Sequence, residues 1–143
     1  MSATYPTTAI REDAIEKLAP SIRGELIQPG VGAYDEARKV YNAMIDRYPA
    51  LIVRAADASD VIAAVRFAGE QGLDLSIRGG GHNVAGFSTN DGGVVLDLSR
   101  MRDVRIDPKR RVARVSGGAP WGDVYHAGSA FGLTDPDAPP KLD

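Results

Sequence analysis

Residues 75–88, LSIRGGGHNVAGFS, decide how the rest of this chain is arranged. A short apolar strand ends in an arginine and runs into consecutive glycines, which permit positive φ and leave no Cβ in the way. Several backbone N–H groups can then point at one anion, and the arginine adds a fixed charge with several donors. We assign to this anion-binding loop Arg78, Gly79, Gly80, Gly81, His82, Asn83 and Gly86. The alternative is a tight surface turn that binds no ligand.

Two common phosphate-binding loops do not fit this stretch. A dinucleotide fingerprint that starts at Gly79 needs a glycine where Val84 stands, and a P-loop through Gly81 and Gly86 needs a lysine where Phe87 stands. Both motifs also require a helix directly after the glycines. Here a polar turn leads instead into another apolar strand at residues 94–98. The sequence therefore predicts a strand–loop–strand cradle, in which Asn83 holds the loop backbone through its side-chain amide.

Size and composition limit the possible classes of protein. The 143 residues are enough for one domain, and the net charge of −2 gives no reason to expect nucleic acid or an anionic membrane as a partner. Cysteine is absent, and two histidines without a matching carboxylate motif make a poor metal site. We find neither a signal-peptide pattern nor an apolar run of the ~20 residues that a membrane span needs, so we expect a cytoplasmic location.

A strand–helix–strand pattern precedes the loop. Residues 51–55 form a continuous apolar run, typical of a buried strand, and Asp57 then offers an N-cap. The helix that follows should end at Gly72. Its predicted buried stripe consists of Val61, Ala64, Val65 and Ala68. We predict that strands 51–54, 75–78 and 94–98 share one parallel sheet, with the glycine loop at a carboxyl end, where such sheets bind ligands.

With the flanking segments included, the predicted fold class is α+β. It consists of a small, mostly parallel sheet with flanking helices and a β-hairpin. Residues 10–19 have helical periodicity, and residues 35–48 are expected to form helical turns with Val40 and Met44 on one side. Alternation around Asp107 and Pro108 predicts the hairpin. A helix should begin near Pro120, and its predicted sheet-facing residues are Val124, Ala127 and Phe131.

Three ordered motifs carry a family resemblance. RGGGHNVAGFS, GGVVLDLSRM and VSGGAPWGDV resemble the FAD-binding region of berberine-bridge-enzyme-like FAD-linked oxidases, flavoproteins of the vanillyl-alcohol-oxidase type with a PCMH-type FAD-binding domain. The resemblance implies FAD as cofactor, with its pyrophosphate along residues 78–83. It also implies that His82 is joined covalently to the flavin 8α carbon. The cofactor-binding residues expected from it are Arg78, Gly79, Gly80, Gly81, His82, Asn83, Gly86, Gly117 and Gly118.

The resemblance also implies a division of the chain. Residues 1–24 are expected to be an N-terminal helical segment, residues 25–133 part of the FAD-binding domain, and residues 134–143 a disordered tail that marks a truncation or frameshift. The expected function is the FAD-binding portion of an oxidoreductase that oxidises an alcohol, sugar or similar small molecule and is inactive as a fragment. No catalytic residue is assigned. A non-catalytic remnant that binds phosphate and an interaction module with an open sheet edge stay as alternatives.

Overall fold

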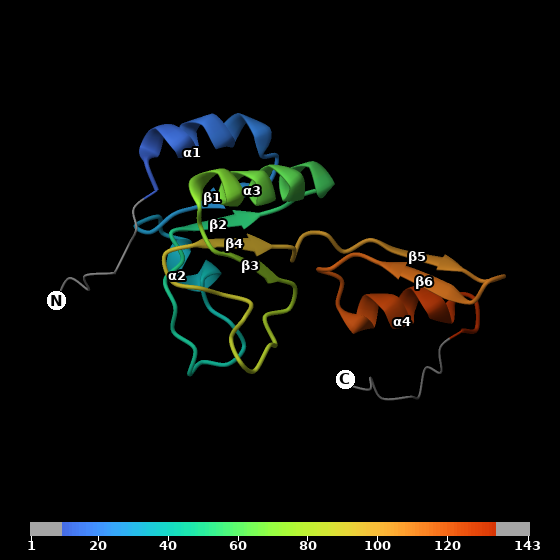
Figure 1. Ribbon diagram of the computed structural model, residues 1–143. Coiled ribbons are helices and arrows are strands. Elements are labelled where there is room, and N and C mark those ends of the chain that lie inside the picture. Colours follow the sequence, from blue (N-terminus) through green and yellow to red (C-terminus); the bar gives the residue numbers. More distant parts are fainter. Residues whose placement is uncertain (1–9, 134–143) are drawn as a thin grey trace.

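The computed structural model describes residues 10–133, and the predicted tail at 134–143 lies outside the described residues. The fold has two parts, a sheet covered by helices and a hairpin covered by one helix (Figure 1). In chain order the elements are α1 (Glu12–Leu18), a short 3-10 turn (Ala19–Ser21), β1 (Glu25–Ile27), α2 (Tyr34–Ala37), β2 (Leu51–Arg54), α3 (Ala58–Gln71), β3 (Leu75–Arg78), β4 (Val94–Asp97), β5 (Val104–Asp107), β6 (Val112–Val115) and α4 (Trp121–Ser129). This is the mixed α+β class that the sequence predicted.

The main sheet has the strand order β1-β2-β4-β3. β4 pairs in parallel with both β2 and β3, whereas β1 pairs antiparallel with β2. The three predicted strands therefore share one parallel sheet, which confirms that prediction. β4 lies between β2 and β3, the two strands that α3 connects. The long loop after β3 returns the chain to the amino-terminal end of these strands, so that β4 runs parallel to both.

Local sequence signals set the limits of α3. The Asp57 carboxylate accepts hydrogen bonds from the N–H groups of Ser59 (2.9 Å) and Asp60 (3.2 Å), so it is the predicted N-cap. Gly72 ends the helix in the left-handed conformation, with φ of +63°. The predicted stripe is correct at Ala64 and Ala68, but Val65 is 45% exposed. Phe67 is buried instead, because the face that the helix turns to the sheet runs through Ala64, Phe67 and Ala68.

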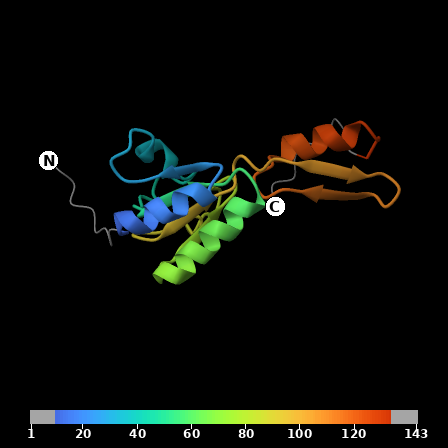
Figure 2. The same ribbon diagram turned by 90° about the horizontal axis from the view of Figure 1, so that it is seen from above.

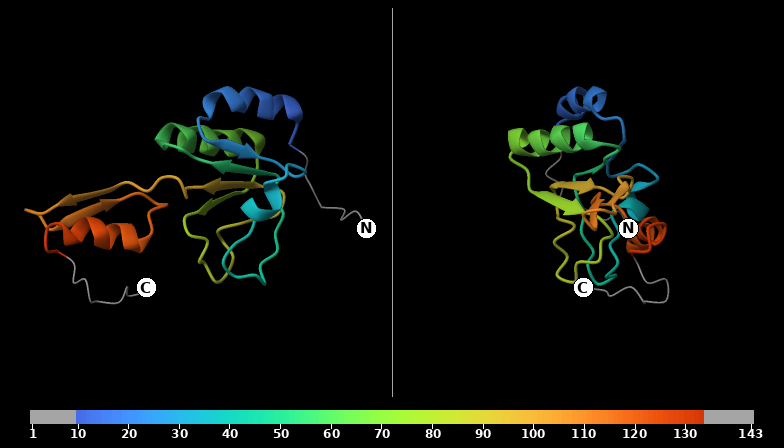
Figure 3. Two further views of the ribbon diagram at one scale, coloured as in Figure 1. Left: turned by 180° about the vertical axis from the view of Figure 1, so that it is seen from behind. Right: turned by 90° about the vertical axis from the view of Figure 1, so that its right-hand side faces the viewer.

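The main core lies between the sheet and the two helices α1 and α3, which cover the same face (Figure 3). It is built from alternate residues of the central strands, such as Leu51 and Val53, and from α1 residues such as Ile15. These strand side chains are fully buried, which is typical of a parallel sheet covered on both faces. The N-terminal helix therefore belongs to the same core as the central strands.

The opposite face carries a smaller core under α2. Ile27, Tyr34, Ile52 and Val95 meet there, and the Tyr34 hydroxyl donates to the carbonyl oxygen of Pro49 at 2.8 Å. α2 is one turn long, so the expected helical turns over residues 35–48 are mostly irregular chain. Met44, which was expected to share a side with Val40, is 90% exposed. Side chains hold this irregular segment by accepting hydrogen bonds from its backbone, as Asn42 does from the Met44 N–H and Asp91 from the Tyr48 N–H.

β5 and β6 form the predicted hairpin, which extends with α4 away from the main sheet (Figure 2). The Asp107 carboxylate closes the turn by accepting from the N–H groups of Lys109 and Arg110 at 3.1 and 3.0 Å. α4 begins after Pro120, as predicted. Phe131, however, lies beyond the end of α4 and is 52% exposed, so it does not face a sheet. The prediction for Phe131 was wrong because α4 ends before that residue.

Candidate functional site

The glycine loop, residues 79–93, connects the carboxyl end of β3 to the start of β4. Gly81 and Gly86 have φ of +71° and +78°, the left-handed region that favours glycine. Among the described residues, the N–H groups of residues 79–82 donate no hydrogen bond. Consecutive free N–H groups on a glycine-rich turn form a concavity suited to an anion.

His82 stands on the outer side of this loop. Its ring is exposed and lies beside the ring of Tyr41, with the centroids 4.8 Å apart and the planes tilted by 46°. A Cβ at Gly80 would lie 2.6 Å from the imidazole Cδ2, so a side chain at that position would push the ring away. Gly80 therefore leaves the space in which the imidazole lies.

Asn83 holds the loop from within, as predicted. Its side-chain oxygen accepts from the N–H of Phe87 at 3.0 Å, and its carbonyl oxygen accepts from the N–H of Gly86 at 3.1 Å. Asn90 holds the far end, where its amide donates to the Val94 carbonyl and its oxygen accepts from Gly93, both at 3.0 Å. The loop thus has a defined shape without a following helix.

The second glycine motif lies against the first. A Cβ at Gly79 would come within 2.5 Å of the Gly117 carbonyl oxygen, and a Cβ at Gly118 within 1.7 Å of the Leu98 carbonyl oxygen. These contacts leave no space for a side chain. Two motifs far apart in the sequence therefore meet beyond the carboxyl end of the parallel sheet, and their backbones form one surface.

Arg78 points into the protein rather than along the loop. Its guanidinium donates to the carbonyl oxygens of Ala37 (2.6 Å) and Lys39 (3.3 Å) and to the Asp97 carboxylate (3.0 Å). Only 6% of the residue is exposed. The guanidinium holds the end of β3 under the glycine loop, and its direct contact with a ligand stays a prediction.

Arg78 belongs to a row of alternating charges across the sheet, which we call the charged rung: Glu25, Arg54, Asp97 and Arg78. These residues are cross-strand neighbours at the same level of β1, β2, β4 and β3. Asp97 accepts from Arg54 at 3.1 Å and from Arg78 at 3.0 Å, and Arg54 reaches Glu25 at 2.9 Å. The charged rung closes the carboxyl end of the parallel sheet directly below the glycine motifs.

The environment of Asp97 keeps its carboxylate charged. Burial by itself would raise the pKa of Asp97. The hydrogen bonds from Ser99 and the charge of Arg78 outweigh burial and lower that pKa below its ordinary value. The charged rung was missed in the sequence because Arg78, Arg54 and Glu25 lie 19, 43 and 72 positions before Asp97, and only the strand order makes them neighbours. A charged residue at the end of each apolar strand was the available signal.

Ser88 and Thr89 were also missed as site residues. Their hydroxyl oxygens are buried, and neither has a hydrogen-bond partner among the described residues. A buried hydroxyl without a partner costs about 1–3 kcal/mol, so each is a candidate donor to a ligand oxygen. Both residues follow the glycines in the same loop, and this suits a phosphate-bearing group such as FAD better than a bare tight turn.

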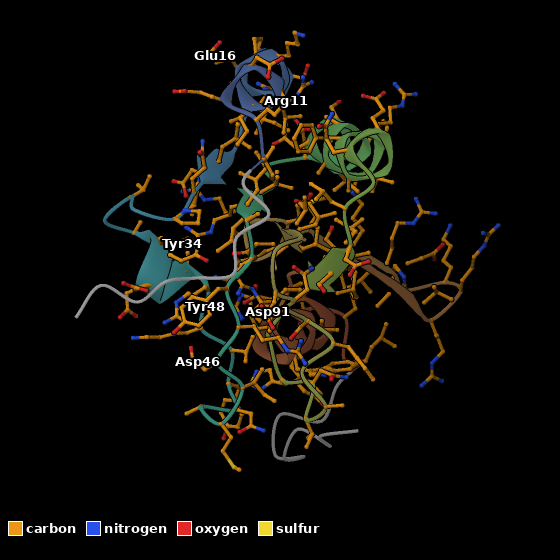
Figure 4. All side chains as sticks on the ribbon, turned by 60° about the vertical axis from the view of Figure 1, so that its left-hand side comes forward. Arg11, Glu16, Tyr34, Asp46, Tyr48 and Asp91 are labelled. Carbon is orange, nitrogen blue, oxygen red and sulfur yellow. The ribbon has the colours of Figure 1, made fainter. Side chains whose placement is uncertain are left out.

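The two loops beside the sheet support each other. The Tyr48 N–H donates to Asp91 at 2.8 Å, and the Tyr48 hydroxyl donates to Asp46 at 3.0 Å. Figure 4 shows Tyr48 near both carboxylates, below Tyr34. Among residues 10–133, no cluster of three or more metal-binding side chains occurs. No helix in that range is long and apolar enough to cross a membrane.

Comparisons with known proteins point to one family. The family model described as FAD binding domain matches residues 49–140. (R)-6-hydroxynicotine oxidase of Paenarthrobacter nicotinovorans is 42% identical over 113 residues, which are 79% of this chain and 25% of that protein. Berberine bridge enzyme-like 9 of Arabidopsis thaliana is 42% identical over 82 residues, 56% of this chain and 15% of that protein.

Solved structures give the same result. The crystal structure of 6-hydroxy-D-nicotine oxidase from Arthrobacter nicotinovorans matches with a TM-score of 0.74 and 41% identity, covering 78% of this chain and 25% of that one. Berberine-bridge-enzyme-like 1 of Physcomitrella patens matches with a TM-score of 0.75 and 27% identity, over 82% and 26% of the two chains. The chain thus spans about a quarter of the length of these oxidases. It belongs to the FAD binding domain family of FAD-linked oxidoreductases, which includes the berberine-bridge-enzyme-like proteins.

Proposed function

We propose that the glycine loop holds the FAD pyrophosphate. The observation that carries this proposal is the set of free N–H groups at residues 79–82 on a loop that belongs to an FAD binding domain. The buried hydroxyls of Ser88 and Thr89 support it, because phosphate oxygens would supply the partners that they lack. The backbones of Gly117 and Gly118 form the adjoining wall, where a Cβ at either position would collide with Leu98.

His82 is the proposed covalent attachment point of the flavin. Its exposed imidazole follows the free N–H groups directly, and Gly80 leaves room for the ring. His82 would supply the imidazole nitrogen that bonds to the flavin 8α carbon. The methyl group and the imidazole would each lose one proton, and dioxygen would take up these two protons and two electrons to give hydrogen peroxide. The alternative role of His82 is a hydrogen bond to a phosphate oxygen, which needs no covalent bond.

The proposed activity of the complete protein is oxidation of an alcohol, sugar or similar small molecule, with the flavin as hydride acceptor. The related 6-hydroxynicotine oxidase and FAD-linked oxidoreductases support the oxidation, and the substrate class follows from the family resemblance of the sequence. This chain spans a quarter of such relatives, so its own part is to hold FAD, and we expect no oxidase activity from it alone. A non-catalytic phosphate-binding remnant or an interaction module would also lack activity, but an interaction module would not bind ADP.

Titration of the 143-residue chain with ADP, the nucleotide half of FAD, tests the cradle. We expect Ser88→Ala to raise the Kd about tenfold, because it removes a hydrogen bond to a charged oxygen. Ser59→Ala, an exposed change in the first turn of α3, is the matched control and should bind like the parent. Equal affinity of all three chains would refute the role of Ser88, and no ADP binding would refute the cradle.

The covalent bond is tested by joining residues 1–133 to the remaining sequence of a relative. After denaturation, flavin fluorescence should stay on the protein band, and His82→Ala should abolish it. A hydrogen bond would be lost on denaturation, whereas a carbon–nitrogen bond would survive. Flavin that leaves the unmodified protein, or stays on the alanine variant, would contradict the assignment.

A further inference from the structure

The chain segment at residues 40–45 lies along the glycine loop, although the two are about 40 positions apart in the sequence. The Tyr41 N–H donates to the Gly81 carbonyl oxygen at 3.1 Å, and the Asn42 amide reaches the Val84 carbonyl oxygen at 3.5 Å. A Cβ at Gly86 would lie 3.0 Å from the side chain of Ile45. The segment thus touches the loop before, beside and after His82.

The Tyr41 side chain acts on His82 itself. The two rings lie 4.8 Å apart between centroids and are tilted by 46°, within the range of favourable aromatic pairs. Tyr41 is nevertheless 77% exposed, so its ring adds little to the core of the protein. An aromatic ring that packs on a histidine restricts the orientations of that histidine.

We infer that residues 40–45 form a clamp that sets the position of the His82 imidazole, with Tyr41 as the positioning residue. Gly80 leaves the space that the imidazole fills, and the Tyr41 ring limits the imidazole from another side. The clamp rests on the proposed function in one respect, that the imidazole faces the flavin. It gives the exposed histidine a fixed direction before any cofactor binds.

The clamp is tested on the 143-residue chain without cofactor, by the imidazole proton resonances in NMR spectra. The chain has two histidines, so His126→Ala assigns the His82 signals. In Tyr41→Ala we expect the His82 resonances to lose the ring-current shift and move toward those of a solvent-exposed histidine. Amide exchange should become up to about tenfold faster at residue 41, whose N–H donates to Gly81, and at Gly86, whose N–H donates to Asn83, which is the equivalent of losing one aromatic pair.

Two further variants separate positioning from a general structural effect. Tyr41→Phe keeps the ring and should keep the His82 resonances of the parent. Met44→Ala changes a more exposed residue of the same segment and should leave them unchanged as well. Unaltered His82 resonances and amide exchange in Tyr41→Ala would overturn the inference. So would equal changes in Met44→Ala, because the effect would then not depend on the Tyr41 ring.

Titration with FAD and ADP links the clamp to the proposed function. Tyr41→Ala should weaken FAD binding about threefold to tenfold and leave ADP binding unchanged, since ADP has no flavin to meet His82. An equal loss for both ligands would overturn the positioning role. If no variant binds either ligand, the proposed function fails, and the NMR result still decides whether the clamp exists.

Discussion

Arg78 ends β3 with its guanidinium between the Asp97 carboxylate and the carbonyl oxygen of Ala37. A charge at the end of a strand before a glycine loop suggests a ligand contact, but this guanidinium already donates to three acceptors inside the protein. Removing one partner of a buried ion pair leaves the other charge uncompensated. The arginine therefore stabilises the platform on which the glycine loop rests.

We expect Arg78→Met to lower the free energy of unfolding by about 3 kcal/mol, because Asp97 loses a buried partner. Arg100→Met is the matched control, since Arg100 pairs with Glu25 at the surface and should cost less than about 1 kcal/mol. Urea unfolding of the three chains measures both values. Similar losses in the two variants would show that the Arg78 pair contributes no more than a surface pair.

Asp60 is a buried carboxylate that holds three backbone groups. It accepts from the N–H groups of Arg23 (2.8 Å), Gly24 (2.9 Å) and Ala56 (2.8 Å), and so ties β1 to the start of α3. Burial by itself would raise the pKa of Asp60, but these hydrogen bonds outweigh burial and lower that pKa below its ordinary value. Folding is therefore coupled to pH through this group.

A carboxyl group with a lowered pKa in the folded state stabilises the fold above its unfolded pKa, about 3.9, and loses that contribution as the pH falls through the folded pKa. We expect the free energy of unfolding to decrease below about pH 4. In Asp60→Asn this decrease should be smaller, whereas Asp103→Asn, at an exposed position, should behave like the parent. Urea unfolding between pH 2.5 and 7 tests this, and an unchanged slope in Asp60→Asn would contradict it.

At the scale of elements, the hairpin and α4 are attached through a close backbone contact at Gly118. Its N–H donates to the Met101 carbonyl oxygen at 3.0 Å, and a Cβ there would lie 1.7 Å from the Leu98 carbonyl oxygen. Backbone atoms cannot move aside as a flexible side chain can. The contact therefore holds the segment after β6 against the segment after β4, beside the glycine loop.

We expect Gly118→Ala to destabilise the protein by about 2–4 kcal/mol, because the added Cβ overlaps backbone. Gly122→Ala is the matched control, since nothing lies within 4 Å of a Cβ there and alanine favours the helix by up to about 1 kcal/mol. Thermal unfolding should thus shift in opposite directions for the two variants. A Gly118→Ala chain as stable as the parent would mean that the backbones can separate without cost.

At the scale of the whole molecule, the two parts of the fold differ in burial. β4 is buried along its whole length, whereas all of β6 is exposed. Local opening requires less free energy where fewer apolar contacts are lost. We expect the amides of β5 and β6 to exchange with solvent at least about 100-fold faster than those of β2 and β4. Hydrogen exchange measured by NMR tests this, and equal rates would show that the molecule opens as one unit.

Much of the fold could be predicted from the sequence because its signals are local. The apolar runs predict the strands, Asp57 and Gly72 predict the limits of α3, and Asp107 predicts the turn of the hairpin. Periodicity and turn chemistry depend on residues a few positions apart. The glycine loop was predicted in the same way, from an arginine followed directly by three glycines.

The tertiary structure alone decided which distant segments meet. The position of β4 between β2 and β3 makes Asp97 the neighbour of Arg78, and this turns the arginine away from the loop. The contact of Gly79 with Gly117 and the pairing of Tyr41 with His82 likewise join segments tens of residues apart. No local pattern encodes such contacts, because they follow from strand order and from the path of long loops. The sequence by itself determined the elements and the glycine loop, and packing determined how the side chains around that loop are arranged.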